Sequence, residues 1–492
     1  SSPEVAALVN TTTAARQRFA NLVIRSLQEP VPRELLDEAR RQKDEAERAL
    51  GERNLDARAE LTRFSAGVEA VRRALPANAA LVSFVRYERK SKPAGSSYGA
   101  FVVRPESDRV AFVQLGSAST LDKIVEEWRK EASGKSIARG VPASQAERMY
   151  LTAAIRLRRS VWDPLLSDIG SASRVFVVPD GRLNLVNLSA LPDGNGYLAE
   201  RNAIIHYLTT ERDLLSIDRE PTATHGLLTV GGPAFDEGPV APAAAEARRG
   251  AECQSLAQIH FNNLPGSLSE VAAIGSLWPK TNANDVVLLS GAAATETAVK
   301  RAVAGRRVVH LATHGFVLGA DCEPGPAGVR AVGGLTRANP ETAVVAEENP
   351  LLLTGLALAG ANPRGTVAPD ADEGILTADE IARLNLQGTE WAVLSACDTG
   401  LGEIKAGEGV FGLRRAFQIA GVRTVIMSLW PLEDVSTQDW MGTLYEGGLQ
   451  KKLDTPAAVR EAGLSVLRSR KARGHSTHPF YWAAFVAAGD WR

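Results

Sequence analysis

Two short stretches decide the fold: Val308-Val309-His310-Leu311-Ala312-Thr313-His314-Gly315 and Trp391-Ala392-Val393-Leu394-Ser395-Ala396-Cys397-Asp398-Thr399-Gly400. Each is an apolar run that ends in a reactive side chain followed by glycine or other turn-forming residues. Apolar runs of this length, bounded by turn signals, are typical of buried strands in a parallel sheet. Ligands of open α/β sheets bind beyond the carboxyl ends of the strands. His314 and Cys397 are therefore both expected where such a sheet carries its chemistry.

Strands and helices alternate around these two stretches from about residue 221 onward. Further strand-like runs are Leu227–Val230, Val286–Leu289 and Thr424–Leu429. The residues Ser267 to Glu270 and Thr377 to Glu380 match capping boxes, in which the two side chains satisfy free amides at a helix start. Alternation of this kind predicts an α/β fold with a parallel sheet and helices on both faces.

The remaining sequence suggests two more parts. Residues 1–75 are rich in Ala, Glu and Arg and predict a charged helical segment. Residues 78–116 hold three β-rich runs separated by turns, which indicates an antiparallel meander. We therefore expect a helical segment over 1–75, a second part over 76–220 and the main α/β domain over 221–492. Residues 317–374, rich in Gly, Pro and Asp, predict an exposed, mobile segment over the site.

The composition excludes several classes of function. The 492 residues include 56 Lys plus Arg and 57 Asp plus Glu, a net charge of -1. This balance argues against a general surface for nucleic acid or anionic membranes. Three cysteines give no disulfide framework, so we expect a reducing, cytoplasmic location. The sequence has no apolar run long enough to span a bilayer and no signal-peptide pattern at its start. Because CxxC and HExxH spacings do not occur, no metal or cofactor is expected.

Cys397 and His314 have the residue types of a nucleophile and its base. A catalytic cysteine acts as a thiolate, and a histidine within hydrogen-bond reach can take the thiol proton. The alternative for Cys397 is a buried structural cysteine, since free cysteines are often buried. Its place at a strand end favours catalysis. His310 lies inside the strand and is expected to be structural, packing beneath the site or orienting it.

Other candidate groups show weaker patterns. Residues 407–412 match GxGxxG, but they do not follow a strand directly. We interpret them as a glycine-rich loop that shapes a substrate cleft and starts a helix; a dinucleotide-binding oxidoreductase is the distant alternative. The remaining cysteines and two late histidines lack paired spacing, so we expect structural cysteines and surface histidines: Cys253, Cys322, His475 and His478.

Five motifs in order resemble the CHAT domain: His310–Gly315, Asn349–Leu352, Ser395–Gly400, Gly407–Phe417 and Ser428–Pro431. The resemblance is specific from about residue 175 to the closing segment Pro479–Phe485, and it weakens toward the N-terminus. CHAT proteins are caspase-like cysteine peptidases related to caspases, separases and gingipains. The resemblance implies a caspase-like parallel-sheet α/β sandwich, preceded by a degenerate caspase-like half over 76–220 and the helical N-terminal segment. The tetratricopeptide repeats that many members carry are not evident in this chain.

The resemblance also implies roles for individual residues. His314 matches the catalytic histidine and Cys397 the nucleophile. The backbone N–H groups of Gly315 and Cys397 match the oxyanion hole, where donors stabilise the tetrahedral intermediate. The strand that ends near Trp430 corresponds to the segment lining the S1 pocket. Candidates for that pocket are Asp398, Ser428, Trp430 and Asp434.

Taken together, these features predict a cysteine endopeptidase that cleaves a dedicated protein substrate. Regulation by a protein partner or by ordering or self-cleavage of residues 317–374 is expected, and a role in bacterial defence or cell death is implied by the family. The chemistry requires no metal, although calcium regulates some caspase relatives. The alternative is a catalytically latent scaffold that recruits partners through 76–220 and the helical segment. Fast alkylation of Cys397 near neutral pH would distinguish the peptidase from the scaffold.

Overall fold

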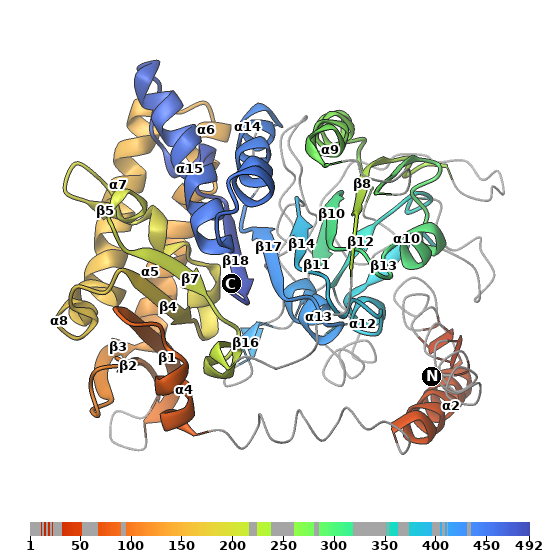
Figure 1. Cartoon of the computed structure of the whole chain (residues 1–492), viewed down its shortest axis with the longest axis horizontal. Coiled ribbons are helices and arrows are strands. Elements are labelled where there is room, and N and C mark those ends of the chain that lie inside the picture. The colour runs from red at the N-terminus through yellow and green to blue at the C-terminus, as the bar shows by residue number, and fades with distance from the viewer. Residues whose placement is uncertain are drawn as a thin grey trace.

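Figure 1 presents the computed structural model of the chain. The structure describes a few positions before residue 23, and then residues 32–51, 67–89, 95–215, 224–237, 260–279, 285–317, 351, 354–362, 373–395, 404–405, 409–410, 412–430 and 434–492. The three cysteines, Cys253, Cys322 and Cys397, and Asp398 lie outside these residues.

One large sheet organises the described residues. In spatial order its eleven strands are β3 (Ala111–Ser117), β2 (Gly95–Val103), β1 (Ala79–Arg89), β4 (Arg174–Val178), β7 (Ile204–Tyr207), β18 (Phe485–Gly489), β17 (Thr424–Ser428), β14 (Trp391–Leu394), β10 (Val308–Ala312), β8 (Leu227–Pro233) and β9 (Val286–Gly291). The pairs from β17 through β14, β10 and β8 to β9 are parallel, and so are β1, β4 and β7. The prediction of an α/β fold with a mostly parallel sheet is confirmed.

The first five strands of this order form the first half of the sheet, and the last six form the second half. β1, β2 and β3 pair antiparallel, which confirms the predicted meander. Because one sheet continues through both halves, the predicted boundary near residue 220 lies between neighbouring parts of a shared core. The boundary itself stays a prediction.

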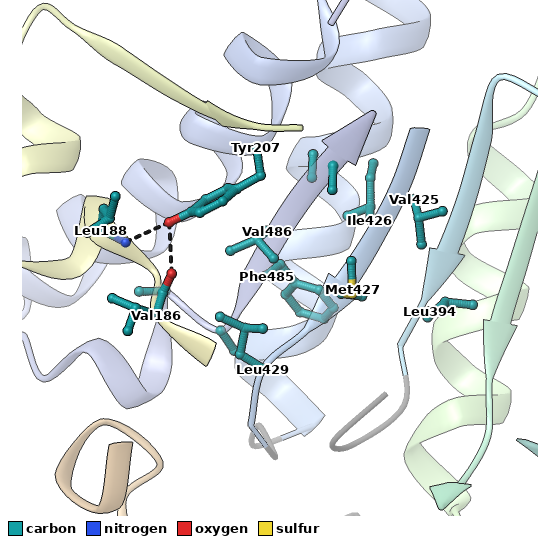
Figure 2. Close-up of a cluster of buried hydrophobic side chains, with 14 of the residues drawn as sticks. Val186, Leu188, Tyr207, Leu394, Val425, Ile426, Met427, Leu429, Phe485 and Val486 are labelled. Carbon is teal, nitrogen blue, oxygen red and sulfur yellow. Dashed lines mark hydrogen bonds between the residues drawn. The ribbon is translucent and has the colours of Figure 1, made fainter. Parts of the chain in front are cut away.

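The two halves meet at β18. This strand pairs antiparallel with β17 along its whole length but joins β7 through a single pair, Ala488 and Tyr207. Beside this pair, as Figure 2 shows, the Tyr207 hydroxyl donates to the Val186 carbonyl and accepts the Leu188 N–H, both at 2.8 Å, within the first half. Apolar side chains of β17 and β18 fill the same cluster (Figure 2). The two halves therefore meet through a single strand pair and a shared apolar cluster.

The described residues also form helices. They are α2 (Arg33–Gly51), α4 (Val68–Ala74), α5 (Ala118–Ala132), α6 (Lys135–Ala138), α7 (Ala143–Val161), α8 (Leu166–Ile169), α9 (Pro265–Leu277), α10 (Glu296–Ala302), α12 (Ala378–Ile381), α13 (Leu413–Ile419), α14 (Asp434–Tyr445) and α15 (Thr455–Ala472). In the first half, α4 packs through Val71 and Leu75 on one set of strand side chains, and α5 packs on the alternate set. The helical prediction for residues 1–75 is confirmed where α2 and α4 are described.

The two predicted capping boxes had different outcomes. Thr377 and Glu380 form one at the start of α12, as predicted. The prediction for Ser267 and Glu270 is wrong, because α9 begins at Pro265 and both residues lie inside it. Proline suits the first helical position, since its missing N–H would have no partner there. The Ser267 hydroxyl instead donates to the Leu264 carbonyl and accepts the Gly232 N–H.

Two other predictions need correction. Residues 317–374 were expected to be exposed and mobile, but the described part 354–361 is mostly buried. Its strand β12 (Thr354–Ala357) pairs with β11 (Gly315–Val317) and β13 (Ile375–Thr377). His478 was expected at the surface, but it is fully buried and accepts the Phe480 N–H. Burial lowers the pKa of His478 to about 4.

Candidate active site

His314 lies directly beyond the carboxyl end of β10, as predicted. The strand is buried from Val308 to Ala312, and the His314 side chain itself is only 3% exposed. A run of β-branched and apolar residues favours a central strand covered on both sides. The strand therefore delivers an imidazole to the edge of the sheet while keeping it largely out of water.

One hydrogen bond orients the His314 ring. Its Nε2 lies 2.8 Å from the backbone carbonyl of Asn262, three residues before α9. A carbonyl oxygen only accepts, so Nε2 carries the proton in this contact. In the neutral ring the basic nitrogen is then Nδ1, which is the nitrogen that can take a proton from a nucleophile. Asn262 thus sets the tautomer that a general base requires.

Aromatic side chains hold the ring on two sides. The Phe235 and Phe261 ring centroids lie 5.2 and 5.6 Å from that of His314, and both phenylalanines are buried. Phe316 packs against Phe261 in turn, with centroids 6.1 Å apart. Tight packing of this kind restricts a ring to few orientations. The imidazole is therefore fixed by a hydrogen bond and by packing.

The register of β11 and β12 determines the direction in which the Gly315 N–H points. The Ala357 N–H donates to the His314 carbonyl at 2.9 Å, so residues 314 and 357 form a hydrogen-bonded pair of the β11–β12 ladder. The next pair, Gly315 and Leu356, is then a non-hydrogen-bonded one, and its N–H groups point away from the partner strand. The Gly315 amide therefore faces away from β12, as an oxyanion donor would need to.

Cys397 lies outside the described residues, but the strand that precedes it, β14, lies directly beside β10, the strand that precedes His314. β10 and β14 pair with an offset of 83 residues, from Val308 opposite Trp391 to Leu311 opposite Leu394. The Ser395 N–H continues the ladder by donating to the Leu311 carbonyl at 3.0 Å. His314 and Cys397 are separated by the same 83 residues in sequence.

The four predicted pocket residues have different surroundings. Ser428 ends β17 and is buried. Trp430 lies in the core: its ring packs edge-on against Trp128 at 5.9 Å, and its Nε1–H donates to the Phe480 carbonyl. Asp434 is the first residue of α14, and its side chain lies outside the described part of the chain, as does the whole of Asp398. Trp430 thus has a packing role that the sequence did not indicate.

A buried polar chain lies beneath the strand that carries His314. His310 is fully buried, with Nδ1 3.0 Å from the Tyr445 hydroxyl of α14 and Nε2 3.0 Å from Oε1 of Glu270 on α9. Burial, followed by the nearby Glu270 carboxylate, raises the pKa of Tyr445 well above its usual range. Tyr445 therefore stays a neutral donor. The expected structural role of His310 is consistent with these contacts, which connect β10 to two helices.

Sequence reasoning missed several residues that these contacts reveal. Asn262 acts through a backbone carbonyl, which any residue type could supply, so its identity gave no signal. Glu270 and Tyr445 lie 40 residues before and 135 residues after His310. For Glu270 the sequence of α9 did hold a hint: this glutamate lies among apolar positions of the helix, and a buried glutamate requires a partner.

The described residues contain no group of three or more His, Cys, Asp or Glu side chains that could hold a metal ion. Within the same residues, no helix combines the length and the apolar character needed to cross a membrane.

Known proteins resemble this chain at several levels. Tetratricopeptide repeat protein 28 of Mus musculus is 30% identical over 208 residues, which are 41% of this chain, and its Homo sapiens counterpart is 29% identical. The chain spans only 8% of the length of these relatives. Among solved structures, the Saccharomyces cerevisiae separase–securin complex matches 92% of this chain and 33% of its own at 10% identity, with a TM-score of 0.49. The Arg-specific cysteine proteinase gingipain R matches 76% of each chain at 11% identity, with a TM-score of 0.36.

A family match covers most of the chain. Residues 152–490, well over half of the sequence, match the CHAT domain. The matched range includes β4 and β7 of the first half and all of β8 to β18. It also includes the His314 strand end, the β14 strand that precedes Cys397 and the α9 segment that holds the imidazole. The chain therefore belongs to the CHAT domain family, as its sequence motifs predicted.

Proposed function

We propose that this protein is a cysteine endopeptidase with Cys397 as nucleophile and His314 as general base. One observation carries the proposal: a buried imidazole at a strand end donates its Nε2–H to a backbone carbonyl, which leaves Nδ1 as the base. The place of this ring at a strand end, next to an amide that faces away from β12, also supports the proposal, since a histidine that serves only in packing requires neither. The equal offset of 83 residues in the β10–β14 register and in the His314–Cys397 separation supports the pairing.

The chemistry follows from these groups. His314 Nδ1 takes the thiol proton of Cys397, and the thiolate sulfur attacks the scissile carbonyl carbon. The carbonyl oxygen becomes an oxyanion that the amides of Gly315 and Cys397 stabilise. As the C–N bond breaks, the imidazolium returns its proton to the leaving amine. Water, deprotonated by His314, then hydrolyses the thioester and regenerates the thiol.

The surroundings of the base favour this cycle. Phe235 and Phe261 exclude water from the ring faces, and their π-systems remain compatible with an imidazolium. The Asn262 carbonyl stabilises the protonated ring, because its dipole points its negative end at Nε2–H. Both interactions support a thiolate–imidazolium pair.

We further propose that the substrate is a dedicated protein and that the first half, with α2, contributes to recognition of a partner or substrate. The first half shares one core with the second, so a ligand held on it would lie on the same rigid body as His314. We also propose that the protein is cytoplasmic and acts in bacterial defence or cell death.

Cleavage of a diverse peptide library tests the proposal. Wild type, Cys397→Ala and His314→Ala would be compared at pH 7, with mass spectrometry of the products giving the residue before the cut bond. Cleavage by wild type alone supports the proposal. No cleavage by any of the three, together with equal iodoacetamide labelling of Cys397 in wild type and His314→Ala, would contradict it and favour the scaffold.

A further inference from the structure

The carbonyl that holds His314 belongs to a segment with little support of its own. Residues 260–264 precede α9 without regular secondary structure; Asn262 is exposed, whereas Phe261 and Leu264 are buried. A segment without regular backbone hydrogen bonds opens more readily than a strand or helix does. A catalytic tautomer that depends on this carbonyl therefore needs another group to hold the segment in place.

Asn362 supplies such a group. Its Oδ1 accepts the Phe261 N–H at 2.9 Å, and its Nδ2 donates to the Phe261 carbonyl at 3.0 Å. One side-chain amide thus pairs with both backbone groups of the residue adjacent to Asn262, as a neighbouring strand would. The second Nδ2 proton goes to Oδ1 of Asp236 at 2.7 Å. The amide uses its acceptor and both donors in these contacts.

The backbone of Asn362 is itself anchored beside the site. Its N–H donates to the Phe235 carbonyl at 2.9 Å, and the Gly360 N–H donates to the Ala234 carbonyl at 3.1 Å. The loop follows β12, whose neighbour β11 begins at Gly315. Asn362 therefore connects both phenylalanines that flank His314, together with the segment that fixes its tautomer, to the strand next to the proposed oxyanion donor.

We propose that Asn362 is a positioning residue for the peptidase reaction: its side-chain amide fixes the Asn262 carbonyl and thereby keeps His314 in the Nε2–H tautomer. This inference deepens the proposed function and rests on it. Asn362 touches neither substrate nor Cys397 in this role and acts only through the 260–264 segment.

The role requires an amide rather than a carboxylate of the same shape. Aspartate could accept the Phe261 N–H, but it could donate to neither the Phe261 carbonyl nor Asp236. Two carboxylates would then face each other where the Nδ2–Asp236 contact of 2.7 Å now stands. Asn362→Asp should therefore release the segment, and Asn362→Ala should do so without adding a charge.

The test compares these two variants with a matched control. Asn187 is also an asparagine that bonds two backbone groups, accepting the Ser189 N–H at 3.0 Å and donating to the Ala483 carbonyl at 2.7 Å. It bonds residues 189 and 483 instead of the 260–264 segment, so Asn187→Asp imposes the same chemical change at a different place in the molecule. The full chain would be labelled with ¹⁵N-histidine, and His314→Gln would assign the His314 signals. Iodoacetamide labelling of Cys397 would be followed from pH 5 to 9.

The expected result is specific to the tautomer. Wild type and Asn187→Asp should show His314 as a single Nε2–H tautomer, whereas both Asn362 variants should show a mixture. Cys397 labelling at pH 7 should fall by about 10- to 100-fold in the Asn362 variants, as small displacements of a catalytic group commonly cause. A single Nε2–H tautomer and wild-type labelling in Asn362→Ala would overturn the inference.

The two proposals fail in different ways. If Cys397 of wild type labels no faster than in His314→Ala, the proposed peptidase is contradicted. The His314 tautomer then decides alone whether Asn362 holds the Asn262 carbonyl, because the ¹⁵N signals require no activity. An equal tautomer change in Asn187→Asp would also overturn the inference, since the effect would then reflect general loosening.

Discussion

The two halves of the sheet use polar side chains at their strand ends in different ways. After β4, Asp180 accepts the Arg86 N–H and the Gly181 N–H, both at 2.7 Å, so both carboxylate oxygens satisfy backbone amides, one of β1 and one of the adjacent residue. After β10, His314 bonds a carbonyl 52 residues away and keeps one ring nitrogen as a base. The first arrangement satisfies amides of a turn and of β1, whereas the second leaves Nδ1 of the neutral His314 ring as the nitrogen that can accept a proton. Both residues follow the end of a parallel strand, so under the proposed function it is the hydrogen-bond partner of the side chain that determines whether the residue can act as a base.

The same contrast holds for the buried histidines inside the strands. His206 of β7 bonds the Gly489 carbonyl through Nε2 at 2.9 Å and packs edge-on against Phe176, and burial lowers its pKa to about 4. His310 of β10 lies between an acid and a phenol on two different helices. The histidine of the first half closes the junction with β18, and that of the second half supports the strand that carries the proposed base.

The largest expected difference concerns the strand-end residues themselves. His314→Ala should lower kcat/KM for a cleaved peptide by about 10⁴-fold, the upper range for loss of a general base. Asp180→Ala should leave kcat/KM near the wild-type value. Steady-state assays on one peptide from the library would measure both. A comparable loss of activity in both variants would show that the two strand-end residues do not differ in the way described above.

The buried histidines should differ in their contribution to stability. His310→Leu leaves the buried Glu270 without its imidazole partner and should cost about 3–5 kcal/mol. His206→Leu removes one contact with a backbone carbonyl and should cost about 1–3 kcal/mol. Urea unfolding at pH 7 measures the free energy of unfolding of each variant. Equal losses would show that the acid adds nothing to the His310 network.

The first half should also make stability depend on pH through His206. Its folded pKa of about 4 lies below the unfolded value, so the unfolded chain binds the proton more tightly. Stability therefore falls as pH drops through the window from about 6.5 to about 4, and His206 accounts for about 2 kcal/mol between pH 7 and pH 5. Unfolding of wild type and His206→Gln at the two pH values checks this. If the free energy of unfolding of His206→Gln changes between pH 7 and pH 5 as much as that of wild type, other groups cause the pH dependence.

The smallest effect should come from the turn that follows β4. Asp180→Ala removes a side chain that accepts two backbone amides and should cost about 1 kcal/mol, as loss of a cap does. Thermal unfolding at pH 7 would detect the change, with Asp180→Asn as the conservative control. A loss above that of His206→Leu would mean that Asp180 contributes more than these two backbone contacts.

The sequence predicted local features better than it predicted contacts between segments. The β10 and β14 runs, the meander of β1 to β3 and the Thr377 cap depend on neighbouring residues, so their patterns are visible in the chain. The Glu270–His310 and Asn362–Phe261 contacts join segments 40 and 101 residues apart, and single residues of those types give no periodic signal. Ser267 matched a capping motif, but Pro265 started the helix two residues earlier.

The place of β18 has a consequence for the order of assembly. This strand lies between β7 and β17 at the centre of the sheet, yet every other strand of the sheet precedes it in the chain. During synthesis from the N-terminus, the first half and the other five strands of the second half leave the ribosome before β18, which joins the two halves. The sheet can then close only after residue 489 has emerged, a long-range pairing that is slow to form. Under the proposed function, a nascent chain would remain an incomplete peptidase until that point.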